Sequence, residues 1–338
     1  MRRRGRIMSI MSGATSVKGV GQEQIVFLIT ALLFAVFALT LPGFLSAANM
    51  LTLLRSVSVL GVLGLGMLIV VLGRGIDLSM VALMAISVAW SMQLIGAGTP
   101  AWLALCYGLG FAILMSLISG ILIAYGEIPP LFATLAMGTF VYGFGRAHLI
   151  IGTDVVYMPP NIGWVKHIGQ GAFFGVPMPV IVAFLAAVLV WAFLRFTKPG
   201  WFIYAIGDNA AAARVTGMPV RPLLVMQYVI SGAICFVAGL ITATSVAAMN
   251  TRVVNSNMIY DVILVVVIGG VGLSGGRGTV RNVVVGTLLI GVLMNGMTIM
   301  DMQYTVQNVV KSLILLAAVV ADSLLNPRDE QTGQQGDI

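Results

Sequence analysis

The stretch FTKPGWFIYAIGDNAAAARVTGMPVRPLL, residues 196–224, separates two blocks of nearly continuous hydrophobic sequence. Within it, Asp208 and Asn209 precede a run of alanines, and Gly217 and Pro219 follow shortly after. Asp or Asn suits a helix N-cap, alanine propagates a helix well, and Gly followed by Pro ends one. The pattern therefore predicts a short helix inside a polar loop. Such a helix suits contact with a soluble partner, and an amphipathic connector is an equally good interpretation.

The composition places the chain in a membrane. Of the 338 residues, 59% are hydrophobic and only 9% are charged, with a mean hydropathy of +1.05. Soluble domains carry roughly 25% charged residues. Apolar runs of about 20 residues match helices that cross a hydrocarbon layer about 30 Å thick, and no run alternates as barrel strands do. We predict an all-α, polytopic transmembrane helical bundle.

The hydrophobic runs predict about ten spans. They lie at about residues 25–45, 53–72, 78–97, 101–124, 130–151, 176–196, 223–248, 259–274, 281–300 and 304–322. The first run is longer than a signal-peptide core and no small-x-small cleavage pattern ends it, so we expect an uncleaved first span. An even number of spans returns the chain to its starting side. Both termini are therefore expected on one side.

The positive charges assign that side. Short cytoplasmic loops carry an excess of Lys and Arg. With a cytoplasmic N-terminus, thirteen of the eighteen basic residues lie on the cytoplasmic side: Arg2, Arg3, Arg4, Arg6, Lys18, Arg74, Arg195, Lys198, Arg214, Arg221, Arg277, Arg281 and Arg328. The other five lie in outer loops or at span ends: Arg55, Arg146, Lys166, Arg252 and Lys311. This distribution also explains the net charge of +7 without nucleic acid, because no aromatic residues interleave the basic ones.

The expected organisation has three parts. Residues 1–24 form a basic cytoplasmic tail, residues 25–322 the transmembrane domain, and residues 323–338 a cytoplasmic C-terminal tail. Within the domain, residues 152–176 form the largest outer loop. Its aromatic, Pro and Gly residues suit a segment lying on the membrane, which can dock an external partner. Residues 197–222 form the cytoplasmic loop that holds the predicted short helix.

Several motifs of catalysis or cofactor binding are absent or misleading. Residues Gly270–Gly275 match G-x-G-x-x-G, but expected helices on both sides exclude a dinucleotide fold. None of the four lysines follows a glycine, so there is no phosphate-binding P-loop, and nucleotide energy must come from another subunit. His148 and His167 are too few for a metal site. Cys106 and Cys235 lie in apolar runs and are interpreted as packing residues. We expect no enzyme, cofactor or metal site in this chain.

Polar residues near the spans are candidates for a transport pathway. They are Asp77, Asp261, Asn295 and Asn308. Ionisable groups are costly inside a membrane and are functional candidates by default. Helix capping and hydrogen bonds between helices are the alternative, which we favour for Asp77 and Asp261. For Asn295 we weigh a pathway role and a structural role equally.

Three stretches together resemble one family. They are GRGIDLS (73–79), YAIGDNAAAARVTGM (204–218) and DVILVVVIGGVGLSGGRGTV (261–280). The chain resembles, from about residue 49 to 322, the permease subunits of bacterial ABC importers of the ribose/monosaccharide type. This resemblance implies an inner-membrane core of two permeases, the second being a copy or a paralogue. It also implies a periplasmic substrate-binding protein and cytoplasmic ABC ATPase domains that hold ATP and Mg.

The resemblance assigns the short helix a role. The segment Asn209–Gly217 is similar to the family's coupling helix, which docks on the ATPase. The residues expected at this contact are Asp208, Asn209, Ala212, Ala213, Arg214 and Gly217. Family members usually have Gly before the Asn and Glu after it, where this chain has Asp208 and Ala210. Arg74 likewise stands where the family usually has Gly.

The expected function is therefore that of a permease subunit in an ABC importer. Its solute is a sugar or a sugar-like polyol, delivered by the periplasmic binding protein and driven by the separate ATPase. The alternative is an ion-coupled secondary transporter of a small polar solute, which would need intramembrane acids placed to carry protons or Na⁺.

Overall fold

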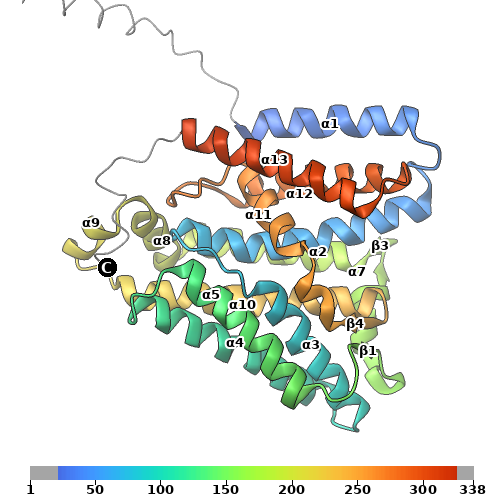
Figure 1. The fold of residues 1–338 in the computed structure, drawn as a ribbon, viewed down its shortest axis with the longest axis horizontal. Helices are drawn as coiled ribbons and strands as arrows, with labels where there is room; N and C mark the ends of the chain where they lie inside the picture. Colours follow the sequence, from blue (N-terminus) through green and yellow to red (C-terminus); the bar gives the residue numbers. More distant parts are fainter. Residues whose placement is uncertain (1–21, 326–338) are drawn as a thin grey trace, which may run out of the picture.

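The computed structural model describes residues 22–325, which form mainly helices (Figure 1). The α-helices are α1 (Gln22–Thr40), α2 (Ala47–Leu72), α3 (Met80–Gly96), α4 (Ala101–Ala124), α5 (Pro130–Phe144), α6 (His167–Gln170), α7 (Met178–Phe196), α8 (Lys198–Asp208), α9 (Ala210–Val215), α10 (Val220–Ser245), α11 (Met258–Ile268), α12 (Val280–Ile299) and α13 (Tyr304–Leu325). The remaining helical turns are η1 (Gly145–Leu149), η2 (Pro160–Lys166) and η3 (Thr251–Asn255). The strands are β1 (Val155–Tyr157), β2 (Ala172–Phe173), β3 (Val176–Pro177) and β4 (Ala248–Asn250).

Each of the ten predicted segments contains a helix, which confirms the polytopic helical bundle. Among the described residues, six helices are long and apolar enough to cross a membrane: α1, α2, α4, α7, α10 and α12. The predicted tails fall largely outside the described residues, which begin at Gln22, the first residue of α1, and end at Leu325, the last residue of α13. Strands are short: β1 pairs antiparallel with β4, and β2 with β3.

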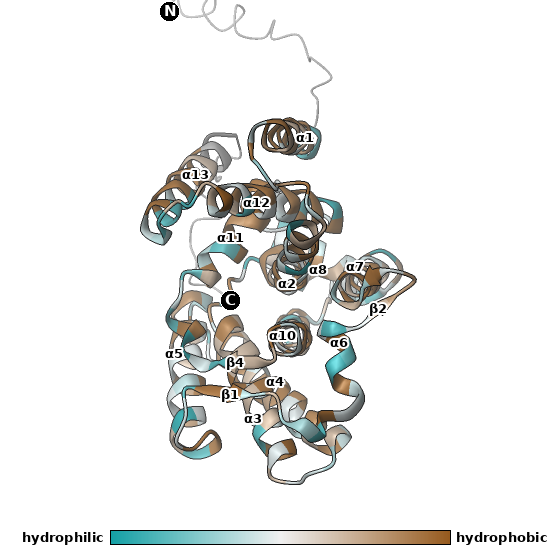
Figure 2. Cartoon of the chain, turned by 90° about the vertical axis from the view of Figure 1, so that its right-hand side faces the viewer, coloured by the Kyte–Doolittle hydropathy of each residue, from teal (hydrophilic) through white to brown (hydrophobic). Residues whose placement is uncertain are grey.

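Helices α2 and α10 form the centre of the bundle. Seen end-on, they lie near the middle, while α1 lies at one edge (Figure 2). Helix α10 packs against α2, α3 and α4. Lipid tails are as apolar as leucine, so close backbone approach rather than hydrophobic burial drives such packing. Gly232 shows the closeness, because a Cβ there would lie 2.0 Å from the hydroxyl oxygen of Ser116 on α4. Substitution of this glycine would push the two helices apart.

Several helices are shorter than the sequence predicts: α5, for example, ends at Phe144 rather than residue 151 and is followed by η1. Helix α3 begins at Met80 rather than residue 78, and α11 ends at Ile268 rather than residue 274. The 11 residues of α11 rise only about 16 Å, half of the hydrocarbon layer. Non-helical backbone at membrane depth is tolerated where protein covers it and satisfies its polar groups. In the segment before α3, for example, the amide of Leu78 donates to the hydroxyl of Thr134 on α5 at 3.1 Å.

The molecule has two distinct ends (Figure 1). The basic end, defined by Arg195, Lys198, Arg214, Arg221 and Arg281, holds α8 and α9 together with the start of α1 and the end of α13. The strand end, defined by β1 to β4, holds α6 as well. The start of α1 and the end of α13 thus share one end, as an even number of spans requires. The excess of positive charge predicts that the basic end is cytoplasmic.

Thiol labelling tests this orientation. The exposed Cys106 is first replaced by alanine, while Cys235 is buried and stays. Single cysteines then replace Lys198 at the basic end or Lys166 at the strand end, both of which are exposed. A membrane-impermeant maleimide should label position 198 only in inverted vesicles and position 166 only in spheroplasts. Labelling of position 166 in inverted vesicles would contradict the predicted orientation.

Candidate functional site

Helix α9 confirms the short helix predicted in the polar loop, and both of its ends are capped. The amide of Ala212 donates to the side-chain oxygen of Asn209 at 2.9 Å, which makes Asn209 the N-cap. Gly217 follows the helix with a φ of 80°, and the amide of Met218 donates to the carbonyl of Ala213 at 3.1 Å. This glycine-ended geometry is a Schellman motif. Six residues can therefore hold a helical form that would be marginal without caps.

The faces of α9 differ in exposure. Ala213 is only 4% exposed and packs into an apolar cluster formed by α4, α8 and α10. Ala211 and Ala212 are exposed, and Val215 has 90% of its surface exposed. Ala213 thus attaches α9 to the bundle and presents no surface to a partner. Val215 was not among the residues expected from the sequence, although its helical spacing from Ala211 and Ala212 places it on their face.

The other expected contact residues surround this face. Asp208, Asn209 and Gly217 are exposed, whereas Arg214 is partly buried. One terminal nitrogen of Arg214, Nη2, is buried without a hydrogen-bond partner in the described part of the chain. The structure therefore brings five of the six expected residues to one outward surface or its edge, and sets Ala213 beneath them.

Helix α8 precedes α9 and was not predicted from the sequence. Its N-cap is Thr197, whose hydroxyl accepts a hydrogen bond from the amide of Gly200 at 3.1 Å. Pro199 lies in the first turn, where the missing amide hydrogen is no loss. Helix α8 buries Ile203 and Ile206. The Thr-x-Pro start was a signal for this helix that the polar character of the stretch obscured.

The end of α8 meets two other segments. The amide of Gly276, in the loop 269–279 between α11 and α12, donates to the carbonyl of Leu72 at the end of α2, at 2.9 Å. Gly207 packs against both, since a Cβ there would lie 1.8 Å from the Leu72 oxygen and 2.4 Å from the Gly276 nitrogen. We call residues 72–74, 207–208 and 275–276 the junction. It leaves no room for a side chain at Gly207.

Arg74 ties the junction to the start of α9. Its Nε donates to the carbonyl of Gly207 at 2.7 Å, and its Nη2 donates to the carbonyl of Asp208 at 2.5 Å. Its φ of 67° lies in the left-handed backbone region that glycine prefers. Residues with a side chain lose roughly 1–2 kcal/mol in this conformation. Hydrogen bonds from a charged donor are worth about 1.5–3 kcal/mol each and offset that cost. The departure from the family's glycine thus adds a link between α2 and α8.

The loop 269–279 completes this region. The hydroxyl of Tyr204 on α8 donates to the carbonyl of Gly278 at 2.8 Å. Burial raises the pKa of Tyr204 above its usual value, so the phenol stays a donor at neutral pH. The G-x-G-x-x-G residues Gly270–Gly275 lie in this loop between two helices, not after a strand. Gly270 and Gly275 have positive φ and form turns in this loop, where the sequence predicted a helix as far as residue 274.

Two substitutions of Arg74 separate its backbone from its side chain. Arg74→Gly removes the hydrogen bonds and relieves the positive φ, whereas Arg74→Ala removes the bonds and keeps the strain. Arg74→Ala should therefore lower the thermal unfolding temperature of the purified protein more than Arg74→Gly does, by a difference of about 1 kcal/mol in unfolding free energy. Equal unfolding temperatures for the two variants would show that the backbone at this position is not strained.

Asn295 pairs with Asn49. Each side-chain amide donates to the other's oxygen, at 2.8 and 2.9 Å, and Asn49 also donates to the carbonyl of Phe44 at 2.7 Å. The pair joins α12 to the first turn of α2. Asn49 was not singled out in the sequence because its partner lies 246 positions away. The hydrogen bonds give Asn295 a role between helices, and its position in the lining of a cavity, described below, leaves it as a pathway candidate as well.

A double-mutant cycle measures this pair. Asn295→Leu and Asn49→Leu each leave one amide without its partner, while the double variant removes both polar groups. The summed destabilisation of the two single variants should exceed that of the double variant by about 0.6–1.7 kcal/mol. This is the coupling energy found for other hydrogen bonds between membrane helices. Thermal unfolding in detergent gives the four values, and additive effects would contradict the pairing.

Asp261 forms a buried ion pair with Lys311. The Nζ of Lys311 lies 2.8 and 2.9 Å from the two carboxylate oxygens, and the residues are 7% and 5% exposed. The pair joins α11 to α13, and Asn308 lines the same cavity of about 410 Å³. The side-chain oxygen of Asn308 is buried without a hydrogen-bond partner among the described residues. Lys311 was expected only in an outer loop or at a span end, and its pairing with Asp261 depends on how α11 and α13 pack.

A second cavity lies between α2, α10, α11 and α12. Its volume is about 530 Å³, and Arg55, Asp261 and Asn295 contribute to its lining with several Ser and Thr residues. Asp261 lines both cavities, so three of the four pathway candidates gather in one region. Arg55, which sequence analysis placed at a span end, brings a positive charge into this second cavity.

Asp77 lies apart from the other three candidates. It is 1% exposed, and its carboxylate accepts bonds from the amide of Ser79 at 3.0 Å and from the hydroxyl of Ser231 on α10 at 2.9 Å. Asp77 thus bonds to Ser79, the residue that precedes α3, but it does not cap this helix as expected, because Ser79 is the N-cap and no side-chain capping bond is made there. The carboxylate lies inside the bundle, however, rather than at a cytoplasmic surface.

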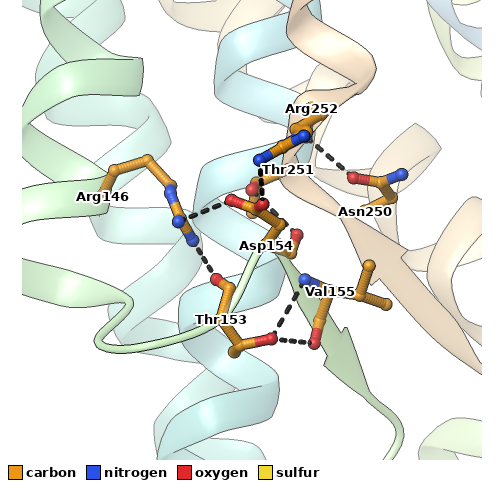
Figure 3. Close-up of polar contacts among 7 residues, drawn as sticks. All are labelled: Arg146, Thr153, Asp154, Val155, Asn250, Thr251 and Arg252. Carbon is orange, nitrogen blue, oxygen red and sulfur yellow. Dashed lines mark hydrogen bonds and ion pairs between the residues drawn. The ribbon is translucent and has the colours of Figure 1, made fainter.

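Asp154 holds the strand end together (Figure 3). Its carboxylate lies between two arginines, 2.6 Å from Arg146 and 2.5 Å from Arg252. Its carbonyl accepts from the amide and the hydroxyl of Thr251, at 2.8 and 2.9 Å. These contacts and the β1–β4 pairing join the loop after α5 to the turn after α10. The expected outer loop 152–176 is thus fixed to the bundle at its beginning.

Residues suited to metal binding do not gather in the described part of the chain. Within residues 22–325, no group of three or more His, Cys, Asp or Glu side chains is placed to hold a metal ion. Cys106 and Cys235 are both free thiols, the first exposed and the second buried.

A bundle of apolar helices, with mainly apolar cavities that also hold charged and amide side chains and with a capped helix at one end, is typical of a multi-pass membrane permease. Comparison with known proteins identifies its family. A family model described as "Branched-chain amino acid transport system / permease component" matches residues 49–319, and the chain belongs to this family.

Three relatives resemble the chain over most of its length. A ribose import permease of Bacillus subtilis (strain 168) is 35% identical over 90% of this chain and 94% of the relative. A galactofuranose transporter permease of Escherichia coli (strain K12) is 34% identical over 90% of this chain and 89% of the relative. A probable ABC transporter permease of the same strain is 29% identical over 90% of each chain. No solved structure matches the chain.

Membership of this family places the chain among multi-pass inner-membrane permeases of ABC importers. A permease component is not itself an enzyme, and it works with an ATPase and a substrate-binding protein. The alternative of an ion-coupled secondary transporter is not favoured by these relatives.

Proposed function

We propose that the chain is the permease subunit through which an ABC importer carries a sugar or a sugar-like polyol across the bacterial inner membrane. A periplasmic binding protein delivers the solute, and a separate cytoplasmic ATPase, which holds ATP and Mg, supplies the energy. The proposal is supported by relatives named for the import of ribose, galactofuranose and fructose. A second copy of this chain, or a paralogue, completes the membrane core.

The observation that carries the proposal is the outward face of α9. Both ends of this helix are capped, Ala213 attaches it to the bundle, and Ala211, Ala212 and Val215 project away from it. An apolar, uncharged face on a rigid helix in an aqueous loop is typical of a protein contact. We assign this face to the ATPase, with residues 197–222 as the coupling loop. Asp208, Asn209, Arg214 and Gly217 border the contact.

The junction gives the ATPase a route to the spans. A displacement of α9 pulls on the end of α8, where Arg74 links Gly207 and Asp208 to the end of α2. The same end of α2 is bonded to Gly276, in the loop that precedes α12. Helices α2 and α12 both line the 530 Å³ cavity. Motion at the ATPase can therefore change the shape of this cavity through a short series of hydrogen bonds.

The two cavities suit a solute with many hydroxyl groups. Amide, hydroxyl and charged side chains of Arg55, Asn295 and Asp261 can exchange hydrogen bonds with a polyol that arrives without its water. Tight binding in the permease is not needed, because the binding protein supplies the affinity. We propose Asp261, Asn295 and Asn308 as pathway residues and Asp77 as a support for α3. Residues 152–176, at the strand end, face the binding protein.

The ion-coupled alternative finds little support in the buried acids. A proton or Na⁺ carrier needs a carboxylate that can release its partner. Asp261 is paired with Lys311, and Asp77 accepts hydrogen bonds from Ser79 and Ser231. Uptake that persists in cells lacking the ATPase would favour this alternative.

A charge on the exposed face of α9 tests the proposed function. Val215→Asp should leave folding unchanged, because the side chain is 90% exposed. It should lower the stimulation of ATP hydrolysis by loaded binding protein at least fivefold, since a buried charge at a protein contact commonly costs more than 1 kcal/mol. The assay uses the reconstituted complex, with a pull-down of the ATPase beside it.

A matched control lies at the same end. Glu127→Gln breaks an exposed ion pair with Arg221, which lies in the first turn of α10 rather than on α9, and should retain full stimulation. Full stimulation in the Val215→Asp complex would exclude α9 as the coupling contact. Loss in both variants would indicate a general effect of charge at this end instead.

A further inference from the structure

Two adjoining cavities at the basic end lie outside the machinery described above. The first, of about 520 Å³, lies between the start of α1, the end of α7, α8 and the start of α12. Its lining includes two arginines, Arg195 and Arg281, and two tryptophans, Trp191 and Trp201. All four of these side chains belong to exposed residues. The cavity therefore combines an excess of positive charge with aromatic side chains and is open to its surroundings.

The second cavity continues the first toward the apolar part of the bundle. Its volume is about 440 Å³, and it runs between α1 and α12, where Phe27, Val284 and Val285 line it. The two cavities share Glu23, Val280 and Arg281. Together they form a continuous space that is charged at one end and apolar at the other.

We propose that these two cavities bind a phospholipid of the surrounding bilayer. The phosphate lies against Arg195 and Arg281, and one acyl chain lies in the groove between α1 and α12. The order of charged and apolar groups in the site matches that of a lipid. The arginines are at the basic end, where the phosphate would lie, and the valines lie further along α12, where the acyl chain would lie. A soluble anion would use the first cavity only, and a hydrocarbon would use the second only.

The chemistry of each part matches this ligand. Arginine offers several N–H donors to phosphate oxygens, and basic pockets between membrane helices on the cytoplasmic side bind lipid headgroups. Tryptophan is enriched at the headgroup level of membranes, where an apolar ring with one N–H is best placed. Glu23 leaves the lining with two positive charges and one negative charge, a balance that suits one phosphodiester anion. The carboxylate can accept a bond from a hydroxyl or ammonium group of the headgroup.

The position of the site gives the lipid an effect on the protein. Trp201 and Tyr204 line the first cavity and both belong to α8, which leads directly into α9. A bound lipid therefore contacts α8 from one side while the junction holds it from the other. The inference depends on insertion in a membrane and does not rest on the sugar substrate or the ATPase contact.

Thermal unfolding of the full-length protein in detergent tests the site. Phosphatidylglycerol is the probe, diacylglycerol with the same acyl chains lacks the phosphate, and inorganic phosphate lacks the chains. Only phosphatidylglycerol should raise the unfolding temperature. In the Arg195→Gln/Arg281→Gln variant its apparent affinity should fall at least tenfold, since each basic residue near a membrane surface contributes about a fivefold factor.

Two further variants make the test specific. Arg221→Gln removes an arginine at the same end, outside both cavities and paired with Glu127, and should keep the wild-type response. Val284→Trp fills the apolar groove without changing charge and should weaken phosphatidylglycerol binding even if the arginine variant does not fold. Equal stabilisation by diacylglycerol or by inorganic phosphate would overturn the proposal. So would an unchanged response in the arginine variant or in Val284→Trp.

Discussion

The hydrogen bond from the amide of Gly276 to the carbonyl of Leu72 holds together three segments that are far apart in the sequence. Helix α2 ends there: the amides of Gly73, Arg74 and Gly75 bond back to its last turn, and the carbonyl of Leu72 finds its partner in the loop before α12. A buried carbonyl without such a partner would destabilise the fold. Gly207 of α8 closes against the same two residues, so the central helix, the loop before α12 and the cytoplasmic loop share one packing constraint.

Polar residues serve two different needs in this bundle. Some act between helices: the amides of Asn49 and Asn295 satisfy each other, and Lys311 neutralises Asp261. Apolar packing alone gives little specificity among lipid-facing helices, and such pairs fix which faces meet. Arg55 and Asn308 have buried atoms without partners in the described residues, and both line cavities. Hydrogen-bonding groups that have no partner in the fold thus belong to residues that line the cavities, where a passing solute can bond to them.

Sequence reasoning recovered what local chemistry determines. Hydrophobic runs located the helices, and Asn209 and Gly217 located the two ends of α9, because caps depend on residues only a few positions apart. It did not find α8, since Thr197 and Pro199 were read as part of a polar interruption. Nor could it find the link from Arg74 to Gly207 or the partner of Asn295, because these contacts depend on which helices pack together. The burial of Ala213 and exposure of Val215 needed the orientation of α9 on the bundle.

Helix α3 begins inside the protein, beside Ser79 and Asp77, both of which are 1% exposed. The aligned peptide groups of a helix give its N-terminus a partial positive charge, which is weakly screened where water is absent. The carboxylate of Asp77, bonded to the amide of Ser79 at this terminus, has the opposite sign. The helix terminus and the bonds from Ser79 and Ser231 therefore offset part of the charge of this buried carboxylate. A cation near this carboxylate would be attracted less strongly than by an isolated one, and an uncharged solute less strongly still.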